Sequence, residues 1–255
     1  MKNITRIGLL LIFATILVYA CKKKETTTTS TTPAATINAK WMVTGSSAAQ
    51  FTSFEFNKGG SYIVVMPAST KFGSYTTSGT TMNLVNFGSI TITKLEGSTF
   101  NFILTTPGKS SQSTFNITTT KATEISLTGN TALLCRTWSL FTMDSVPVAG
   151  TVYECEVMFT QAGTYFVHYE IDSTSAMAQW KWKDNTMKQL CYSWAGAPTC
   201  DGISECTINS ITASKLIMTE SYYGTHYVLV PFITKNSLPF NNPGVPVTIN
   251  RFLGR

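Results

Sequence analysis

The chain has 255 residues, of which 12% are aromatic and 13% are charged, so it can bury one large core or two smaller ones. This composition excludes disorder for most of the chain, and the abundance of Thr and Ser favours β-structure over helix. The net charge of +6 is concentrated at the amino end, because residues 36–255 hold 14 cations against 12 acids. Binding to nucleic acid requires clustered cations on the folded part, so we expect no nucleic-acid partner.

The first twenty residues (1–20) predict a signal peptide. Lys2 and Arg6 precede the apolar run "IGLLLIFATILVYA", which is short for a helix that must cross about 30 Å of hydrocarbon. A short uncleaved membrane anchor is the alternative. The following "LVYAC" resembles the lipobox of bacterial lipoproteins, with Cys21 as the acceptor. The resemblance implies that the Cys21 thiol is lipidated and that the signal is cut before it. It also implies a cell-envelope protein anchored to the outer membrane, on its periplasmic or its outer side.

Residues 21–36 are predicted to join this lipidated cysteine to the folded part. The stretch "TTTTSTTPAAT" has no large apolar side chain to bury, so we expect a solvated linker.

Beyond the linker, apolar and polar residues alternate in short runs separated by turn residues, which is typical of antiparallel β-sheet. The run "FEFNKGGSYIVV" predicts a hairpin with a glycine in its turn, and "VMFTQAGTYFV" predicts a second hairpin 103 positions later. Side chains expected inside are Phe54, Phe56, Tyr62 and Val64 in the first hairpin, and Val157, Phe159, Tyr165 and Val167 in the second.

The repetition extends along the chain. Trp41 precedes the first hairpin and Trp138 the second, and "ITITKLEGSTFNF" aligns without a gap with "CTINSITASKLIM" at an offset of 116. The alternative is that all antiparallel meanders look similar. We interpret the pattern as two tandem units, residues 37–130 and 131–235.

A tryptophan near the start, an F-x-x-x-G-x-Y hairpin and a later pair of isoleucine-rich strands resemble the lipocalin-like domains of bacterial cell-envelope lipoproteins. The resemblance implies an all-β protein with two small antiparallel lipocalin-like β-barrels in tandem, and it implies no catalytic residues. Residues 236–255 depart from the family pattern, and their prolines and glycines predict an extended tail, with an added edge strand as one form of it.

Five cysteines lie in the second unit and none in the first, and an exported chain can oxidise them. Cys191 and Cys200 bracket "YSWAGAPT" and can close a short loop. Cys155 and Cys206 both alternate inward, either bridged or packed as small apolar side chains. We find no spacing that supports a zinc site and expect no metal or other cofactor.

Acid and base chemistry has few candidates, since the chain contains only two histidines. If Phe159 and Tyr165 both face inward, paired residue numbers sum to 324 and Glu156 faces His168. Such a pair can act as a base with its orienting carboxylate, which keeps an envelope hydrolase as an alternative function. Surface cross-strand pairs of this kind are more common.

The stretch "QWKWKDNTMKQLCYSWAGAPTC" contains the strongest candidate for a binding surface. With a turn near Asp184, Trp180 and Trp182 fall on one face of a hairpin, and Tyr192 and Trp194 on the other. A small barrel cannot bury both faces unless something covers the outside. One set is therefore expected to be exposed for a sugar or a partner, or else covered by another part of the chain.

The sequence thus predicts a lipid-anchored, non-enzymatic envelope protein that binds a small apolar or sugar ligand or a protein partner. The alternatives are the hydrolase based on Glu156 and His168, and a purely structural surface module.

Overall fold

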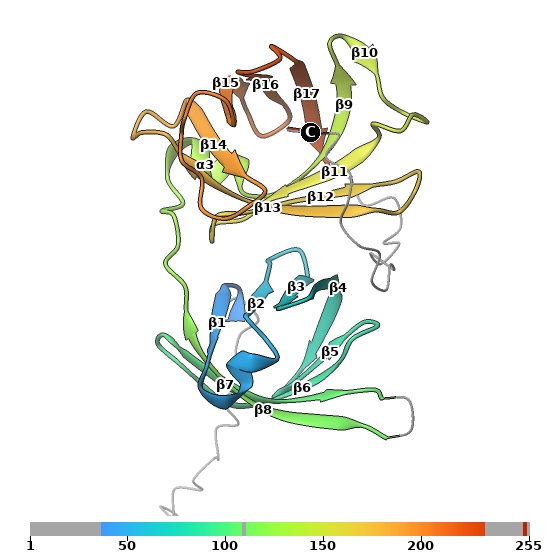
Figure 1. The fold of residues 1–255 in the computed structure, drawn as a ribbon, viewed down its shortest axis with the longest axis vertical. Coiled ribbons are helices and arrows are strands. Elements are labelled where there is room, and N and C mark those ends of the chain that lie inside the picture. Colours follow the sequence, from blue (N-terminus) through green and yellow to red (C-terminus); the bar gives the residue numbers. More distant parts are fainter. Residues whose placement is uncertain (1–36, 109–110, 233–251, 254–255) are drawn as a thin grey trace, which may run out of the picture. The chain divides into compact units, whose positions relative to one another are not determined.

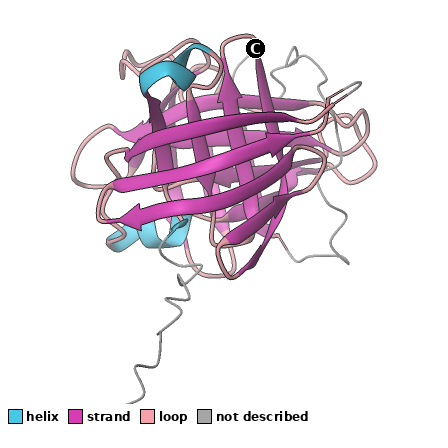
Figure 2. Ribbon diagram, turned by 90° about the horizontal axis from the view of Figure 1, so that it is seen from below, coloured by secondary structure: helices cyan, strands magenta, loops and turns pink. Residues whose placement is uncertain are grey.

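The computed structural model describes residues 37–108, 111–232 and 252–253, and this part of the chain is almost entirely β-structure (Figures 1 and 2). Figure 2 shows only short pieces of helix beside the strands. The strands form two closed antiparallel barrels of eight strands each, which confirms the predicted fold class. Within the described ranges, no helix is long and apolar enough to cross a membrane.

The first barrel is an up-and-down barrel in which each strand pairs with its neighbours in sequence and the last pairs with the first. A short 3-10 helix, η1 (Gly45–Ala49), follows its first strand. The strands are β1 (Lys40–Thr44), β2 (Ser53–Phe56), β3 (Ser61–Met66), β4 (Ser69–Ser78), β5 (Thr81–Leu84), β6 (Gly88–Glu96), β7 (Thr99–Thr106) and β8 (Ser113–Lys121).

The second barrel follows a short helix, α3 (Gly129–Leu134), and closes through pairing of its first and last strands. A two-residue strand, β10 (Val146–Pro147), pairs only with β9, at the edge. The barrel strands are β9 (Thr137–Met143), β11 (Cys155–Phe159), β12 (Thr164–Tyr169), β13 (Ser175–Trp182), β14 (Gln189–Ser193), β15 (Glu205–Ile211), β16 (Leu216–Glu220) and β17 (His226–Pro231).

The two barrels repeat each other in detail. Ile92 pairs with Phe102 in the first, and Ile208 pairs with Met218 in the second, so the offset of 116 is also an offset of register. Each of these strand pairs has a bulge directly after that position. Trp41 and Trp138 each donate an indole hydrogen bond to the carbonyl four residues earlier. The repeat is therefore one of three-dimensional structure as well as of pattern.

Differences between the two interiors determine where a ligand site can exist. The first interior is filled by rings, with Phe54 packed on Phe102 at 5.1 Å and Phe100 on Phe102 at 4.6 Å. The registers place smaller or polar residues at five matching positions of the second barrel, and a larger one, Tyr227, where the first barrel has Ile117. The replacements are Phe54 by Val157, Ile90 by Cys206, Phe100 by Leu216, Phe102 by Met218, and Leu104 by Glu220.

Candidate functional site

The core that includes these smaller side chains also contains a segment from outside the barrel strands. Phe252 and Leu253 are 1% and 0% exposed and belong to the core of the second barrel. The Phe252 ring packs on Tyr227 at 4.6 Å and lies 6.2 Å from Tyr165. The sequence predicted an extended tail over 236–255, of which these two residues are the described part, and they lie inside the barrel rather than along a sheet edge.

Three inward-facing side chains hold the main chain of this segment. The Phe252 amide donates to the Tyr169 hydroxyl at 2.8 Å, and the Tyr165 hydroxyl donates to the Phe252 carbonyl at 3.2 Å. The Trp194 indole donates to the Leu253 carbonyl at 2.8 Å. Burial strongly raises the pKa of Tyr165, so its hydroxyl remains a donor at any ordinary pH. The site thus provides both donors and an acceptor to a peptide backbone.

A carboxylate lies in the same interior. Glu220 is 3% exposed and accepts hydrogen bonds from the Tyr192 hydroxyl at 2.8 Å and the Tyr227 hydroxyl at 3.3 Å. A buried carboxylate is costly unless it is hydrogen bonded, and the two tyrosines meet that requirement. The same hydrogen bonds to Glu220 hold the two tyrosines in place, and they orient the Tyr227 ring that Phe252 contacts.

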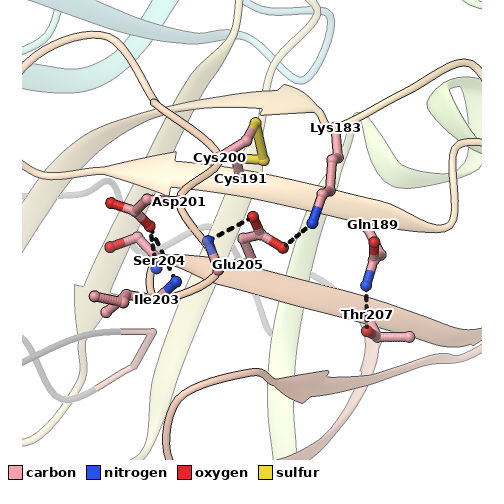
Figure 3. A network of polar contacts seen from close by, with 10 residues as sticks. Lys183, Gln189, Cys191, Cys200, Asp201, Ile203, Ser204, Glu205 and Thr207 are labelled. Atoms are coloured by element: carbon pink, nitrogen blue, oxygen red, sulfur yellow. Dashed lines mark hydrogen bonds and ion pairs between the residues drawn. A yellow bond between two sulfur atoms is a disulfide. The ribbon is translucent and has the colours of Figure 1, made fainter.

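Trp194 begins the loop that follows β14. Cys191 and Cys200 form a disulfide, which closes the segment between them (Figure 3). Glu205, only 2% exposed, accepts from Lys183 at 2.7 Å and from the Gly202 amide at 2.8 Å. This loop is therefore secured on the outside of the barrel. Cys155 and Cys206 are free, buried thiols, and burial raises the pKa of each.

The aromatic hairpin is arranged differently from the prediction. Trp180 pairs with Tyr192 and Trp182 with Leu190, so all four side chains share one face of the sheet, and that face is the interior. Trp180 and Tyr192 are each 2% exposed, while Trp182 and Trp194 are partly buried against the core. The two strands are joined by Lys183–Lys188, and in the resulting register even-numbered residues pair with even-numbered residues. The predicted turn near Asp184 would have paired even-numbered with odd-numbered residues, which puts the two aromatic sets on opposite faces. The expectation of an exposed aromatic set is wrong.

The sequence reasoning therefore identified Tyr192 and Trp194 near the site but missed Tyr165, Tyr169, Glu220 and Tyr227 as a set. One signal was available: Glu220 stands at an inward position that the offset of 116 assigns to Leu104 in the first barrel. A carboxylate at a core position is rare unless it has partners.

Glu156 faces His168, as the register predicted. The hydrogen-bond partners are, however, Ser175 for His168 Nδ1, at 2.9 Å, and Glu170 for the Glu156 carboxyl. Burial, followed by the hydrogen bond to Glu170, raises the pKa of Glu156 to about 8, while burial lowers the pKa of His168. The arrangement is a proton-sharing carboxyl pair beside an imidazole biased toward its neutral form.

This pair predicts a pH-dependent stability. Glu156 in the folded state holds its proton until about pH 8, against 4.5 for the ordinary side chain. Its contribution to stability is complete below pH 4.5 and is lost as the pH rises to about 8. We expect Glu156→Gln to flatten the fall of the melting temperature between pH 5 and pH 9. Glu96→Gln, at an exposed position of the first barrel, is the control and should keep the slope. An identical slope in both variants would contradict the shared proton.

Comparison with known proteins does not identify a family for this chain. No family model matches the chain, and no curated protein matches it in sequence. In the part of the chain that the structure describes, His, Cys, Asp and Glu side chains form no group of three or more that could hold a metal ion. The site is thus defined by its own residues, as an aromatic interior with hydrogen-bonding groups that reach a bound segment.

Proposed function

We propose that the protein is a lipid-anchored component of the cell envelope and that its second barrel binds an external ligand in its interior, without converting it chemically. The anchor rests on the lipobox-like "LVYAC" with Cys21, which lies outside the described residues. The ligand carries at least one large apolar group. The first barrel, filled by its own rings, serves as a structural unit.

The observation that carries the proposal is the burial of Phe252 and Leu253 in the second barrel. Neither residue belongs to a strand, and the barrel closes through β9 and β17 without them. A barrel interior that accepts a large aromatic side chain from elsewhere has the shape and the chemistry to accept one from a ligand. Interiors of eight-stranded barrels are just wide enough to be filled by side chains or to hold one small ligand.

The test uses a fluorescent apolar probe, N-phenyl-1-naphthylamine, and the full chain carrying Phe252→Ala and Leu253→Ala. We expect the probe to bind this variant with one-to-one stoichiometry and at least tenfold more tightly than the unchanged chain, because the two truncations vacate the interior. Adding Met218→Phe restores the residue found at the matching position of the first barrel, Phe102, and should reduce probe binding. Probe binding that Met218→Phe leaves unchanged would place the probe elsewhere and contradict an interior site.

A further inference from the structure

We propose that the ligand of the second barrel is a peptide segment of a protein, with a large aromatic residue followed by an aliphatic one and with basic flanks, and that Phe252–Leu253 is an exchangeable internal copy of it. The inference rests on the proposed function, since it names the ligand of that same interior.

The contacts favour a peptide over a hydrocarbon. The Tyr169, Tyr165 and Trp194 side chains all bond to main-chain groups of the segment: one amide and two carbonyls. A purely apolar ligand would leave the Tyr165 hydroxyl and the Trp194 indole without these acceptors, and losing a partner at a buried polar group is costly. Side-chain selection comes from the Tyr227 ring, which packs on Phe252. The site therefore recognises main-chain groups together with one aromatic side chain, as peptide-binding sites do.

Two features of the bound segment favour its release from the barrel. The main chain of Phe252 and Leu253, the described part of the segment, adds no strand to the sheet, so release of these two residues breaks no ladder hydrogen bond. Leu253 has a φ of +49°, in the left-handed region that costs a non-glycine residue energy. A segment that completed the fold permanently would be expected to pair with an edge or to use glycine at that position. The first barrel, which shares the same register, fills its interior with its own strands instead.

The proposed entrance is one end of the second barrel. Because neighbouring strands are antiparallel, the connections 144–154, 170–174, 194–204 and 221–225 all lie at the same end. Tyr169 ends β12 at this side, and Trp194 directly follows β14 there. Tyr169 and Trp194, which bond the Phe252 amide and the Leu253 carbonyl, are thus at this end, whereas Tyr165 lies near the opposite end of β12.

The entrance has the surface of a protein-binding site. Of the nine large apolar residues that are exposed among the described residues, seven lie on these four connections. They are Val146, Val152, Tyr153, Ile171, Ile203, Tyr222 and Tyr223. Exposed apolar side chains at the proposed entrance provide contact area for the protein that carries the inserted segment. A small-molecule ligand would not need this contact area.

Charge supports a basic partner. The four connections contain the acids Asp144, Glu154, Glu170, Asp172 and Asp201 and no Lys, Arg or His. The connections at the opposite end, 160–163, 183–188 and 212–215, contain three lysines and one acid. The chain's own residues 250–255 have the sequence "NRFLGR", with an arginine on either side of Phe252–Leu253. Opposite charges at an entrance increase the association rate and select among partners.

The first experiment measures binding of three synthetic peptides by calorimetry to the full chain with Phe252→Ala and Leu253→Ala. We expect NRFLGR to bind one to one, NRAAGR to bind at least tenfold more weakly, and NEFLGE to bind more weakly with a reversed dependence on salt. The unchanged chain should bind NRFLGR at least tenfold more weakly than the variant, because a covalently attached segment competes at an effective concentration on the order of 1 mM. Equal binding of NRFLGR and NRAAGR would overturn the proposal. If the apolar probe binds but NRFLGR does not, the interior site remains and peptide recognition fails.

A second experiment keeps Phe252 and Leu253 in place and does not depend on how the double variant folds. Hydrogen exchange of the Phe252 amide is compared with that of Val167, in the middle of β12. We expect Phe252 to exchange at least tenfold faster, because the segment leaves while the barrel stays folded. Tyr169→Phe, which removes the acceptor of that amide but keeps the ring, should increase the rate at Phe252 and leave Val167 unchanged. Equal rates at both amides would mean that the segment leaves only on unfolding, which would overturn the proposal.

Discussion

Replacing Trp180 with alanine is expected to lower the free energy of unfolding of the second barrel by about 3–5 kcal/mol, the range found for truncation of large aromatic side chains in cores. The Trp180 ring meets Phe159 at 5.8 Å and Trp182 at 5.3 Å, both nearly edge to face. Its indole also donates to the Thr160 carbonyl at 3.0 Å. Truncation therefore removes a large apolar surface from the core and leaves a buried carbonyl without this donor.

Urea unfolding followed by circular dichroism measures this effect. The matched control is Lys181→Ala, the next residue on the same strand, whose exposed side chain points outward. It should change the free energy of unfolding by less than about 0.5 kcal/mol. A comparably small change for Trp180→Ala would contradict the place of Trp180 in the core. Trp180 would then again be a candidate for a surface contact.

Cys21→Ser is expected to abolish outer-membrane association altogether. Under the proposed lipidation the Cys21 thiol is the acceptor for the lipid, and each acyl methylene buried in a membrane contributes about 0.8 kcal/mol to anchoring. The variant should be found soluble in the periplasm or uncleaved in the inner membrane. Fractionation with mass spectrometry of the amino end measures both location and cleavage.

Cys135→Ser is the control for this second prediction, since Cys135 is a free, partly buried thiol in the second unit. It should leave both fractionation and processing unchanged. A Cys21→Ser protein with a mature amino end and unaltered association with the outer membrane would contradict the lipid anchor. The ligand site would be unaffected by that outcome, because it rests on residues of the barrel alone.

The pairing of the second-barrel hairpin shows how far local pattern reaches. Phe159 and Tyr165 flank a short glycine turn, and the pairing that follows from placing both inside, with numbers summing to 324, is the pairing in the structure. The turn between Trp182 and Gln189 is longer, and there the predicted faces were wrong. A shift of one residue moves every side chain to the other face, and a longer connection permits several registers. Closure of the whole barrel decides between them.

The all-β architecture, the tandem repeat and the inward residues of the short hairpins could be predicted from residue patterns, because alternation and turn chemistry act within about ten residues. What fills the second barrel could not be predicted in this way. Phe252 lies 83 positions from the Tyr169 hydroxyl that it contacts and 87 from Tyr165. Two isolated residues have no periodicity, and their place inside depends on contacts with Tyr165, Tyr169 and Tyr227, which come from separate strands. That complementarity of shape and hydrogen bonding exists only once the barrel has closed.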